Sequence, residues 1–107
     1  MTIRIKVTKL ALSPALRTYT EEKLGGVEKL VRRWDAAGAV SMSVEIARTT
    51  RHHKKGQIYY AEANLKLPGA MLRAREEHWD MRVAVTKVRM KLKKEIEKYK
   101  QKTTGRA

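Results

Sequence analysis

The chain has 107 residues and a mass of 12.3 kDa, which is the size of one domain. It carries 25 Lys and Arg against 11 Asp and Glu, a formal net charge of +14, and 42% of its residues are hydrophobic. That hydrophobic share excludes a disordered basic tail, and the absence of Cys excludes disulfides, thiolate nucleophiles and Cys-ligated zinc. No apolar run is long enough to span a membrane, and the first ten residues lack the apolar core of a signal peptide. We therefore expect a cytoplasmic protein with no membrane partner.

The first third of the chain predicts a strand and a helix. Residues 2–7 alternate apolar and polar side chains, which is typical of a half-buried strand. Ser13 followed by Pro14 is typical of a helix N-cap and a first helical residue. Apolar side chains then recur at three- and four-residue steps as far as Trp34. We expect one helix that continues through Gly25 and Gly26, because the apolar stripe stays in phase across this pair.

The middle of the chain predicts three more strands. Residues 40–46 alternate strictly, residues 57–67 carry a second alternating face, and residues 71–76 follow a turn. That turn is Leu67-Pro68-Gly69-Ala70, which fits a type II turn with Pro second and Gly third. The polar, basic segment 48–56 is expected to be an exposed connection.

Asp80 is a suitable N-cap for a final helix that reaches about Lys100. The apolar seam of this helix falls within a sector roughly 120° wide. Its members are Met81, Ala84, Val85, Val88, Leu92, Ile96 and Tyr99. We expect a single domain over residues 1–101, followed by a short frayed basic tail over residues 102–107.

The predicted order is β-α-β-β-β-α, an α+β fold in which a four-stranded sheet is covered on one face by both helices. The other face of the sheet is expected to be open to water. The side chains predicted to point outward from it are Arg4, Lys6, Ser43, Glu45, Tyr60, Glu62, Asn64, Lys66, Arg73 and Arg75.

Positive charge is concentrated in the last quarter of the chain. From Arg82 onward there are ten basic residues and two acidic ones. In helical projection the basic residues line both sides of the apolar seam, with Lys87, Lys91, Lys94 and Lys98 on one side and Arg82, Arg89, Lys93 and Lys100 on the other. Like charges at these spacings destabilise an isolated helix. The pattern therefore favours a nucleic-acid partner over a helix face that is merely solvated.

The connection over residues 48–56 is a second candidate for RNA contact. Arg48, Arg51, Lys54 and Lys55 can follow phosphates, and the two neighbouring histidines can stack on bases. The alternative is a solvated connection between strands.

Other chemistry is disfavoured by residue spacing. His52 and His53 have no carboxylate at metal-ligand spacing, and the adjacent Glu76 and Glu77 would point to opposite faces of a strand. We expect no metal, no cofactor, no catalytic residue and no small-molecule substrate.

The segment that enters the last helix resembles the ribosome hibernation-promoting factors, the family of the ribosome-associated inhibitor or protein Y. The residues that carry the resemblance are Leu72-Arg73-Ala74, Glu76-Glu77-His78-Trp79-Asp80-Met81 and Ala84, with support from Ser13-Pro14-Ala15-Leu16-Arg17 and Leu65-Lys66-Leu67-Pro68-Gly69. The similarity covers about residues 2–100. The chain departs from the family at Trp79, where an acidic residue is usual, at Arg82 and Val83, where Tyr-Ala is usual, and at the glycine pair in the first helix.

The resemblance implies a domain similar to double-stranded RNA-binding domains, of the short type without a dimerisation domain. It implies a non-enzymatic factor that binds small-subunit ribosomal RNA in the messenger and transfer RNA channel and blocks translation by occlusion in stress or stationary phase. By position it implies RNA contacts by Lys87, Arg89, Lys91, Lys94 and Lys98, and weaker ones by Lys6 and Arg17. We expect a monomer in solution.

Three other functions stay open from the sequence. The chain could bind structured RNA without preferring the ribosome, act as an enzyme on RNA, or be a protein-interaction domain whose charge keeps it soluble.

Overall fold

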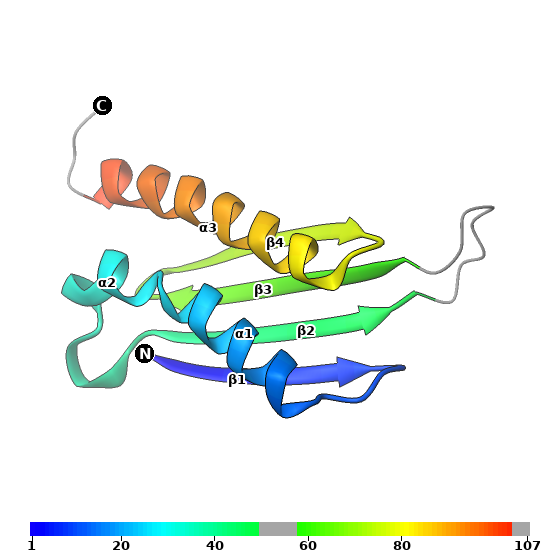
Figure 1. Ribbon diagram of the computed structural model, residues 1–107. Helices are drawn as coiled ribbons and strands as arrows, with labels where there is room; N and C mark the ends of the chain where they lie inside the picture. Colours follow the sequence, from blue (N-terminus) through cyan, green and yellow to red (C-terminus); the bar gives the residue numbers. More distant parts are fainter. Residues whose placement is uncertain (50–57, 104–107) are drawn as a thin grey trace.

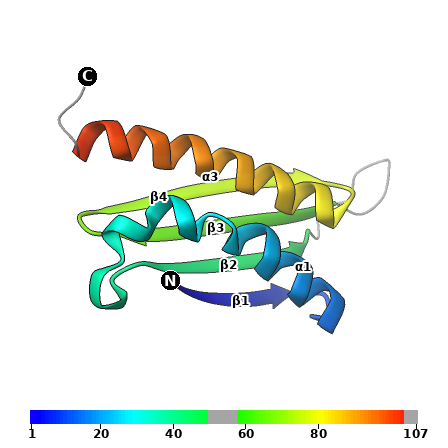
Figure 2. The same ribbon diagram turned by 60° about the vertical axis from the view of Figure 1, so that its left-hand side comes forward.

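The computed structural model describes residues 1–49 and 58–103 of the chain. Its elements are β1 (Thr2–Thr8), α1 (Pro14–Gly25), α2 (Glu28–Val31), the 3-10 turns η1 (Arg32–Trp34) and η2 (Ala36–Gly38), β2 (Ser41–Arg48), β3 (Tyr59–Leu67), β4 (Ala70–His78) and α3 (Met81–Thr103). The strands form one sheet in the order β1-β2-β3-β4, with β1 parallel to β2 and the other pairs antiparallel. Figures 1 and 2 show α1 and α3 side by side over one face of this sheet. The predicted α+β fold is confirmed.

The core lies between the sheet and the two long helices. From the sheet, Met42, Val44, Ile46, Ala61 and Leu65 are buried. From α3, the buried residues are Ala84, Val85, Val88, Leu92, Ile96 and Tyr99. The predicted seam is thus confirmed, with Met81 half-buried at the start of the helix.

Both predicted helix caps are confirmed by hydrogen bonds. The Ser13 Oγ accepts the backbone N–H of Leu16 at 3.1 Å, and the Asp80 Oδ1 accepts the backbone N–H of Arg82 at 2.9 Å. α3 continues past Lys100 to Thr103, whose hydroxyl donates to the carbonyl oxygen of Tyr99 at 3.0 Å. Residues 102 and 103, expected in the frayed tail, are therefore helical, and residues 104–107 lie outside the described residues.

The prediction of one helix from Pro14 to Trp34 was wrong. α1 ends at Gly25, and the chain then passes through a turn into α2 and η1. After Leu24 the backbone bonds tighten: the N–H of Val27 donates to the carbonyl of Leu24 at 3.2 Å, and the N–H of Leu30 donates to that of Val27 at 2.9 Å. The physical reason is that each Gly costs a helix about 1 kcal/mol relative to Ala, so two in succession favour the break.

The apolar stripe of this segment survives the break almost intact. Leu24, Val27 and Val31 are fully buried, and Trp34 packs against the core. Leu30 follows the same three- to four-residue spacing, but it is 38% exposed. The tighter turns keep a spacing of three to four residues, so most of the predicted side chains still reach the sheet.

Two strands are longer than predicted. β2 includes Arg48, which pairs with Tyr59, and β4 continues to His78, which also pairs with Tyr59 from the other side. Glu76 and Glu77 are therefore both strand residues and point to opposite faces, as expected. Glu76 pairs with Lys91 of α3, whereas Glu77 lies 3.6 Å from Arg75 on the open face.

Glu45 is the centre of a polar cluster on the open face of the sheet. The Thr8 hydroxyl donates to its carboxylate at 2.6 Å. This hydrogen bond lowers the pKa of Glu45 below its ordinary value against the opposing effect of partial burial, and Tyr60, Lys6 and Arg75 add smaller effects in the same direction. Partial burial and the same carboxylate raise the pKa of Tyr60, while the Arg75 guanidinium lies 4.1 Å from the centre of its ring. Tyr60 is therefore covered by Arg75 rather than free to stack on a partner.

Two glycines allow a test of backbone geometry without a change in packing. Gly26 has a right-handed φ of −61°, and an added Cβ would have no neighbour closer than 3.5 Å. Gly69 has φ +74°, and an added Cβ would have no neighbour within 4 Å. We predict that Gly26→Ala raises the free energy of unfolding by about 0.5–1 kcal/mol, whereas Gly69→Ala lowers it by about 1–2 kcal/mol. Urea unfolding measures both, and changes of the same sign would contradict the prediction.

The Glu45 cluster predicts a pH-dependent contribution to stability. A carboxyl group with a lowered pKa stabilises the fold above its unfolded-state pKa, near 4.3, and loses this effect as pH falls through the folded-state value. Glu45→Gln should lower the free energy of unfolding at pH 7 by about 0.5–1 kcal/mol, with the difference vanishing in acid. Thermal melting from pH 7 to 3 measures it.

Glu62→Gln is the matched control, because Glu62 lies directly opposite Glu45 on β3. Like charges directly opposite each other are unfavourable, so this change should leave stability at pH 7 unchanged or slightly higher. The stabilisation would not come from the Glu45 carboxylate if both variants lost the same free energy of unfolding, or if the Glu45→Gln difference persisted at pH 3.

Candidate nucleic-acid interface

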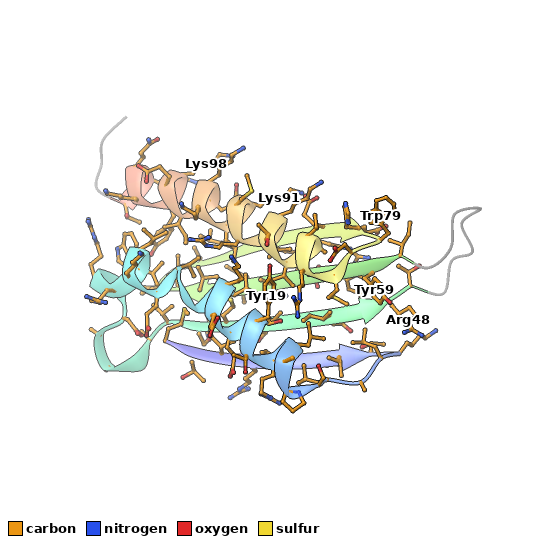
Figure 3. The ribbon with its side chains drawn as sticks, in the orientation of Figure 1. Tyr19, Arg48, Tyr59, Trp79, Lys91 and Lys98 are labelled. Atoms are coloured by element: carbon orange, nitrogen blue, oxygen red, sulfur yellow. The ribbon has the colours of Figure 1, made fainter. Side chains whose placement is uncertain are left out.

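Four lysines form an exposed row on the side of α3 that faces β4. Lys87, Lys91, Lys94 and Lys98, here called the lysine flank, follow one another at steps of four, three and four residues, and all four are exposed. Lys91 fixes the direction of the row, because its Nζ pairs with the Glu76 carboxylate and donates to the Arg75 carbonyl oxygen at 3.1 Å. Figure 3 shows Lys91 and Lys98 on the same outer side of α3.

Intramolecular acids neutralise only part of the lysine flank. Lys91 pairs with Glu76, and Lys98 lies 3.3 Å from the Glu95 carboxylate. Within residues 1–49 and 58–103, Lys87 and Lys94 have no carboxylate partner. Exposed ion pairs contribute roughly 0–1 kcal/mol, so phosphates can compete for the two paired amines. The row is thus a concentrated cationic surface on a rigid helix.

The opposite side of α3 packs against α1, so its basic residues lie in different surroundings from those of the lysine flank. The Arg82 guanidinium lies 5.1 Å from the centre of the Tyr19 ring, and the Tyr19 hydroxyl donates to the Arg82 carbonyl oxygen at 3.3 Å. Arg89 is half-buried beside Gly26, and its Nε has no hydrogen-bond partner among the described residues. Arg89, which the resemblance groups with the lysine flank, therefore lies on the α1 side, where Lys93 and Lys100 are exposed further along.

The remaining candidates lie on other surfaces. Lys6 is exposed on the open face of the sheet, on the far side from α3, and Arg17 is exposed on α1. Arg51, Lys54 and Lys55 lie outside the described residues. The structure therefore brings together the four lysines of α3, and it separates them from Lys6 by the thickness of the sheet.

Sequence reasoning missed a groove at the end of the sheet where β2 ends and β3 begins. Arg48, Tyr59 and Trp79 line it together with the first residues of α1 and α3. The sequence pattern predicts Arg48 in the connection between strands, and it marks Trp79 only as a departure from the family. The available signal was a Trp directly before the Asp80 cap and outside the apolar seam.

Across residues 1–49 and 58–103, no three His, Asp or Glu side chains gather in a way that would hold a metal ion. In the same residues, no helix combines the length and apolar character needed to cross a membrane.

A family sequence model and a known relative both match this chain over nearly its whole length. Residues 3–104 match the sequence model of the family described as sigma 54 modulation protein / S30EA ribosomal protein. The chain is 32% identical over 106 residues to a ribosome hibernation promoting factor of Azotobacter vinelandii. The aligned region covers 99% of this chain and 89% of that protein.

Two solved structures share the fold. The ribosomal subunit interface protein of Coxiella burnetii matches with a TM-score of 0.68 and 32% identity, covering 94% of this chain and 98% of that one. The N-terminal domain of protein Y from Thermus thermophilus matches with a TM-score of 0.72 and 23% identity, covering 92% and 99% of the two chains. With a family match over nearly its whole length, this chain belongs to the sigma 54 modulation protein / S30EA ribosomal protein family, which includes ribosome hibernation promoting factors.

Proposed function

We propose that this protein is a ribosome hibernation factor that binds small-subunit ribosomal RNA through the lysine flank. In this role it occupies the messenger and transfer RNA channel and blocks translation without chemistry. The observation that carries the proposal is the exposed row of four lysines on α3, two of them without an acidic partner in the described residues. The names of the relatives, a ribosome hibernation promoting factor and a ribosomal subunit interface protein, support the choice of the ribosome as partner.

The binding step is electrostatic. The lysine flank runs from residue 87 to residue 98, which is roughly 16 Å along a helix axis. A nucleic-acid duplex carries a negative charge about every 1.7 Å of its axis, so several phosphates lie within reach of such a row. Binding releases the counterions condensed on those phosphates, and this release is the main source of affinity.

The blocking step is steric and depends on a packed domain. The described chain measures 47 × 29 × 18 Å along its principal axes. α3 is held on the sheet by its buried seam, so a bound domain keeps its shape instead of yielding to a competing RNA. Messenger and transfer RNA are then excluded from any volume that the domain fills.

The other candidate residues would add RNA contacts to those of the lysine flank. Arg82 and Lys93 lie on α3 itself, on the side of α1, and they would contact RNA that wraps over the helix. Lys6 and Arg17 would be reached only in a concave site that encloses the domain from several sides. Arg51, Lys54 and Lys55, which lie outside the described residues, would add phosphate contacts, as the sequence predicts.

The lysine flank provides a direct test. Replacing Lys87, Lys91, Lys94 and Lys98 with Gln should abolish co-sedimentation with the small subunit and leave the fold intact, because all four side chains are exposed. Sucrose-gradient sedimentation of purified subunits with the variant measures binding, and thermal melting checks the fold.

The matched control removes the same amount of charge elsewhere. Lys29, Arg32, Arg33 and Lys66 are also exposed and lie outside α3. Their replacement with Gln should leave most co-sedimentation in place. If both quadruple variants lose binding equally, net charge and not the lysine flank is responsible. If excess bulk transfer RNA displaces the native protein from the subunit, binding of structured RNA without ribosome preference is the better description.

Salt dependence gives an independent measure of phosphate contacts. With six to ten contacts, affinity should fall roughly 10³- to 10⁵-fold between 50 and 200 mM salt, by the rule calibrated on duplex DNA. The four-lysine variant should reduce the slope of log K against log salt by about 3–4. Titration of the subunit at several salt concentrations measures both slopes, and equal slopes would remove the lysine flank from the interface.

A further inference from the structure

We propose that the groove at the end of the sheet binds one unstacked nucleotide, with its base against Trp79 and its phosphate between Arg48 and Arg82. The proposal deepens the proposed function, and it rests on that function in taking RNA as the source of the nucleotide.

The groove is built from four elements that are distant in sequence. It is an open depression of about 790 Å³ where β2 ends, β3 begins, and α1 and α3 start. Its lining includes Leu16, Arg48, Tyr59, Trp79, Met81 and Arg82. Figure 3 shows Arg48, Tyr59 and Trp79 at this same end of the sheet. A volume of this size is within the range of small-molecule sites, which is about 300–1,000 Å³.

Trp79 supplies an unused aromatic surface. The residue is 68% exposed, and its one ring contact in the described part of the chain is a T-shaped contact with His78 at 5.5 Å between centroids. By contrast Trp34, the other tryptophan, packs edge-on against Tyr99 at 4.9 Å and belongs to the core. An exposed indole beside a groove is a platform on which any nucleobase can stack.

Two guanidinium groups make the groove cationic. Arg48 lies 5.7 Å from the centre of the Tyr59 ring, and Arg82 lies 5.1 Å from that of Tyr19. The Nε of Arg48 is buried without a hydrogen-bond partner, and neither arginine pairs with a carboxylate within residues 1–49 and 58–103. Aromatic contacts hold both guanidinium groups in place, so their donors stay available for an anion.

Among the described residues that line the groove, Asp80 is the one carboxylate, and it already has a structural role. Its Oδ1 accepts the backbone N–H of Arg82 as the cap of α3. The balance of two cations, one engaged carboxylate and an open indole fits a ligand that is anionic at one end and aromatic at the other. A nucleotide has this chemistry, whereas an acidic peptide would use the cations and leave Trp79 exposed.

The position of the groove matches the path expected for RNA on this domain. Arg82 is the second residue of α3, and Lys87 of the lysine flank follows roughly 8 Å further along the helix axis. A strand that crosses α3 from the lysine flank therefore reaches the groove within a few nucleotides. Trp79 would take up a base that is flipped out of a helix or that belongs to a single-stranded loop.

Tryptophan emission tests the groove directly. Trp34→Phe leaves Trp79 as the single tryptophan and keeps an aromatic ring against Tyr99. Addition of 5′-phosphorylated hexaadenylate should quench the emission of this variant, whereas a hexaglutamate peptide should not. Quenching by both probes alike, or by neither, would overturn the proposal.

Substitutions at Trp79 separate stacking from simple apolar contact. Trp79→Phe should keep the affinity for hexaadenylate within about twofold, and Trp79→Leu should weaken it about tenfold. Met71→Ala is the matched control, because Met71 is an exposed apolar residue that does not line the groove. Fluorescence anisotropy of a labelled hexaadenylate measures all three, and equal affinities for the Phe and Leu variants would refute stacking on Trp79.

The phosphate contact has a separate readout. Arg48→Gln with Arg82→Gln should reduce the slope of log K against log salt for hexaadenylate by about 0.7, because single strands lose about 0.7 per neutralised phosphate and both arginines contact the same one. An unchanged slope would exclude these arginines from the site. If the hexaadenylate assays fail but the protein still co-sediments with the small subunit, only the proposal of a nucleotide-binding groove is refuted. Hexaadenylate binding without co-sedimentation would overturn the ribosomal function and leave the groove standing.

Discussion

Burial of one apolar seam on α3 against the sheet determines how the whole molecule presents its charge. Val85, Val88 and Leu92 are fully buried in this seam. Each contributes about 1.5–3 kcal/mol, whereas each like-charge pair on the exposed side costs only a few tenths of a kcal/mol. The seam also fixes the rotation of the helix about its axis. The burial that holds α3 on the sheet is therefore the same interaction that directs the lysine flank toward the edge of β4.

The neighbouring helix makes the two sides of α3 unlike. In projection both sides are basic, but α1 covers only one of them. On that side Arg82 stacks on Tyr19 and Arg89 is half-buried. Arg is suited to this place because its guanidinium is weakly hydrated and stacks on rings. The free side carries lysines, whose compact ammonium groups remain hydrated until an anion replaces the water. On the α1 side, arginines thus stand where α1 covers α3, whereas the exposed positions further along that side, Lys93 and Lys100, are lysines.

Periodicity in the sequence predicted most of the fold, because strands and helices bury residues at fixed intervals. It gave the α3 seam and both caps correctly, since these depend on residues close together in the chain. It failed at Gly25 and Gly26, where two short helical turns keep nearly the same phase as one long helix. It also placed the ends of β2 and β4 too early, because a strand ends where its partner ends. The lysine flank was predicted from projection, but the half-burial of Arg89 depends on α1. The groove draws on four distant elements, so no local pattern contained it.

Charge and shape have different parts in the proposed function. Phosphates carry no sequence information, so the lysine flank attracts any RNA that comes within about a Debye length, near 8 Å at physiological salt. Preference for one site must then come from groups that act only at contact, and a stacking groove fixed relative to the lysine flank is such a group. The two lie on one packed domain, which sets their separation and direction. An unfolded chain of the same charge would still bind RNA. It could neither hold the lysine flank and the groove at a fixed separation nor exclude a competing strand. The proposed steric block would therefore depend on the core as much as on the lysines.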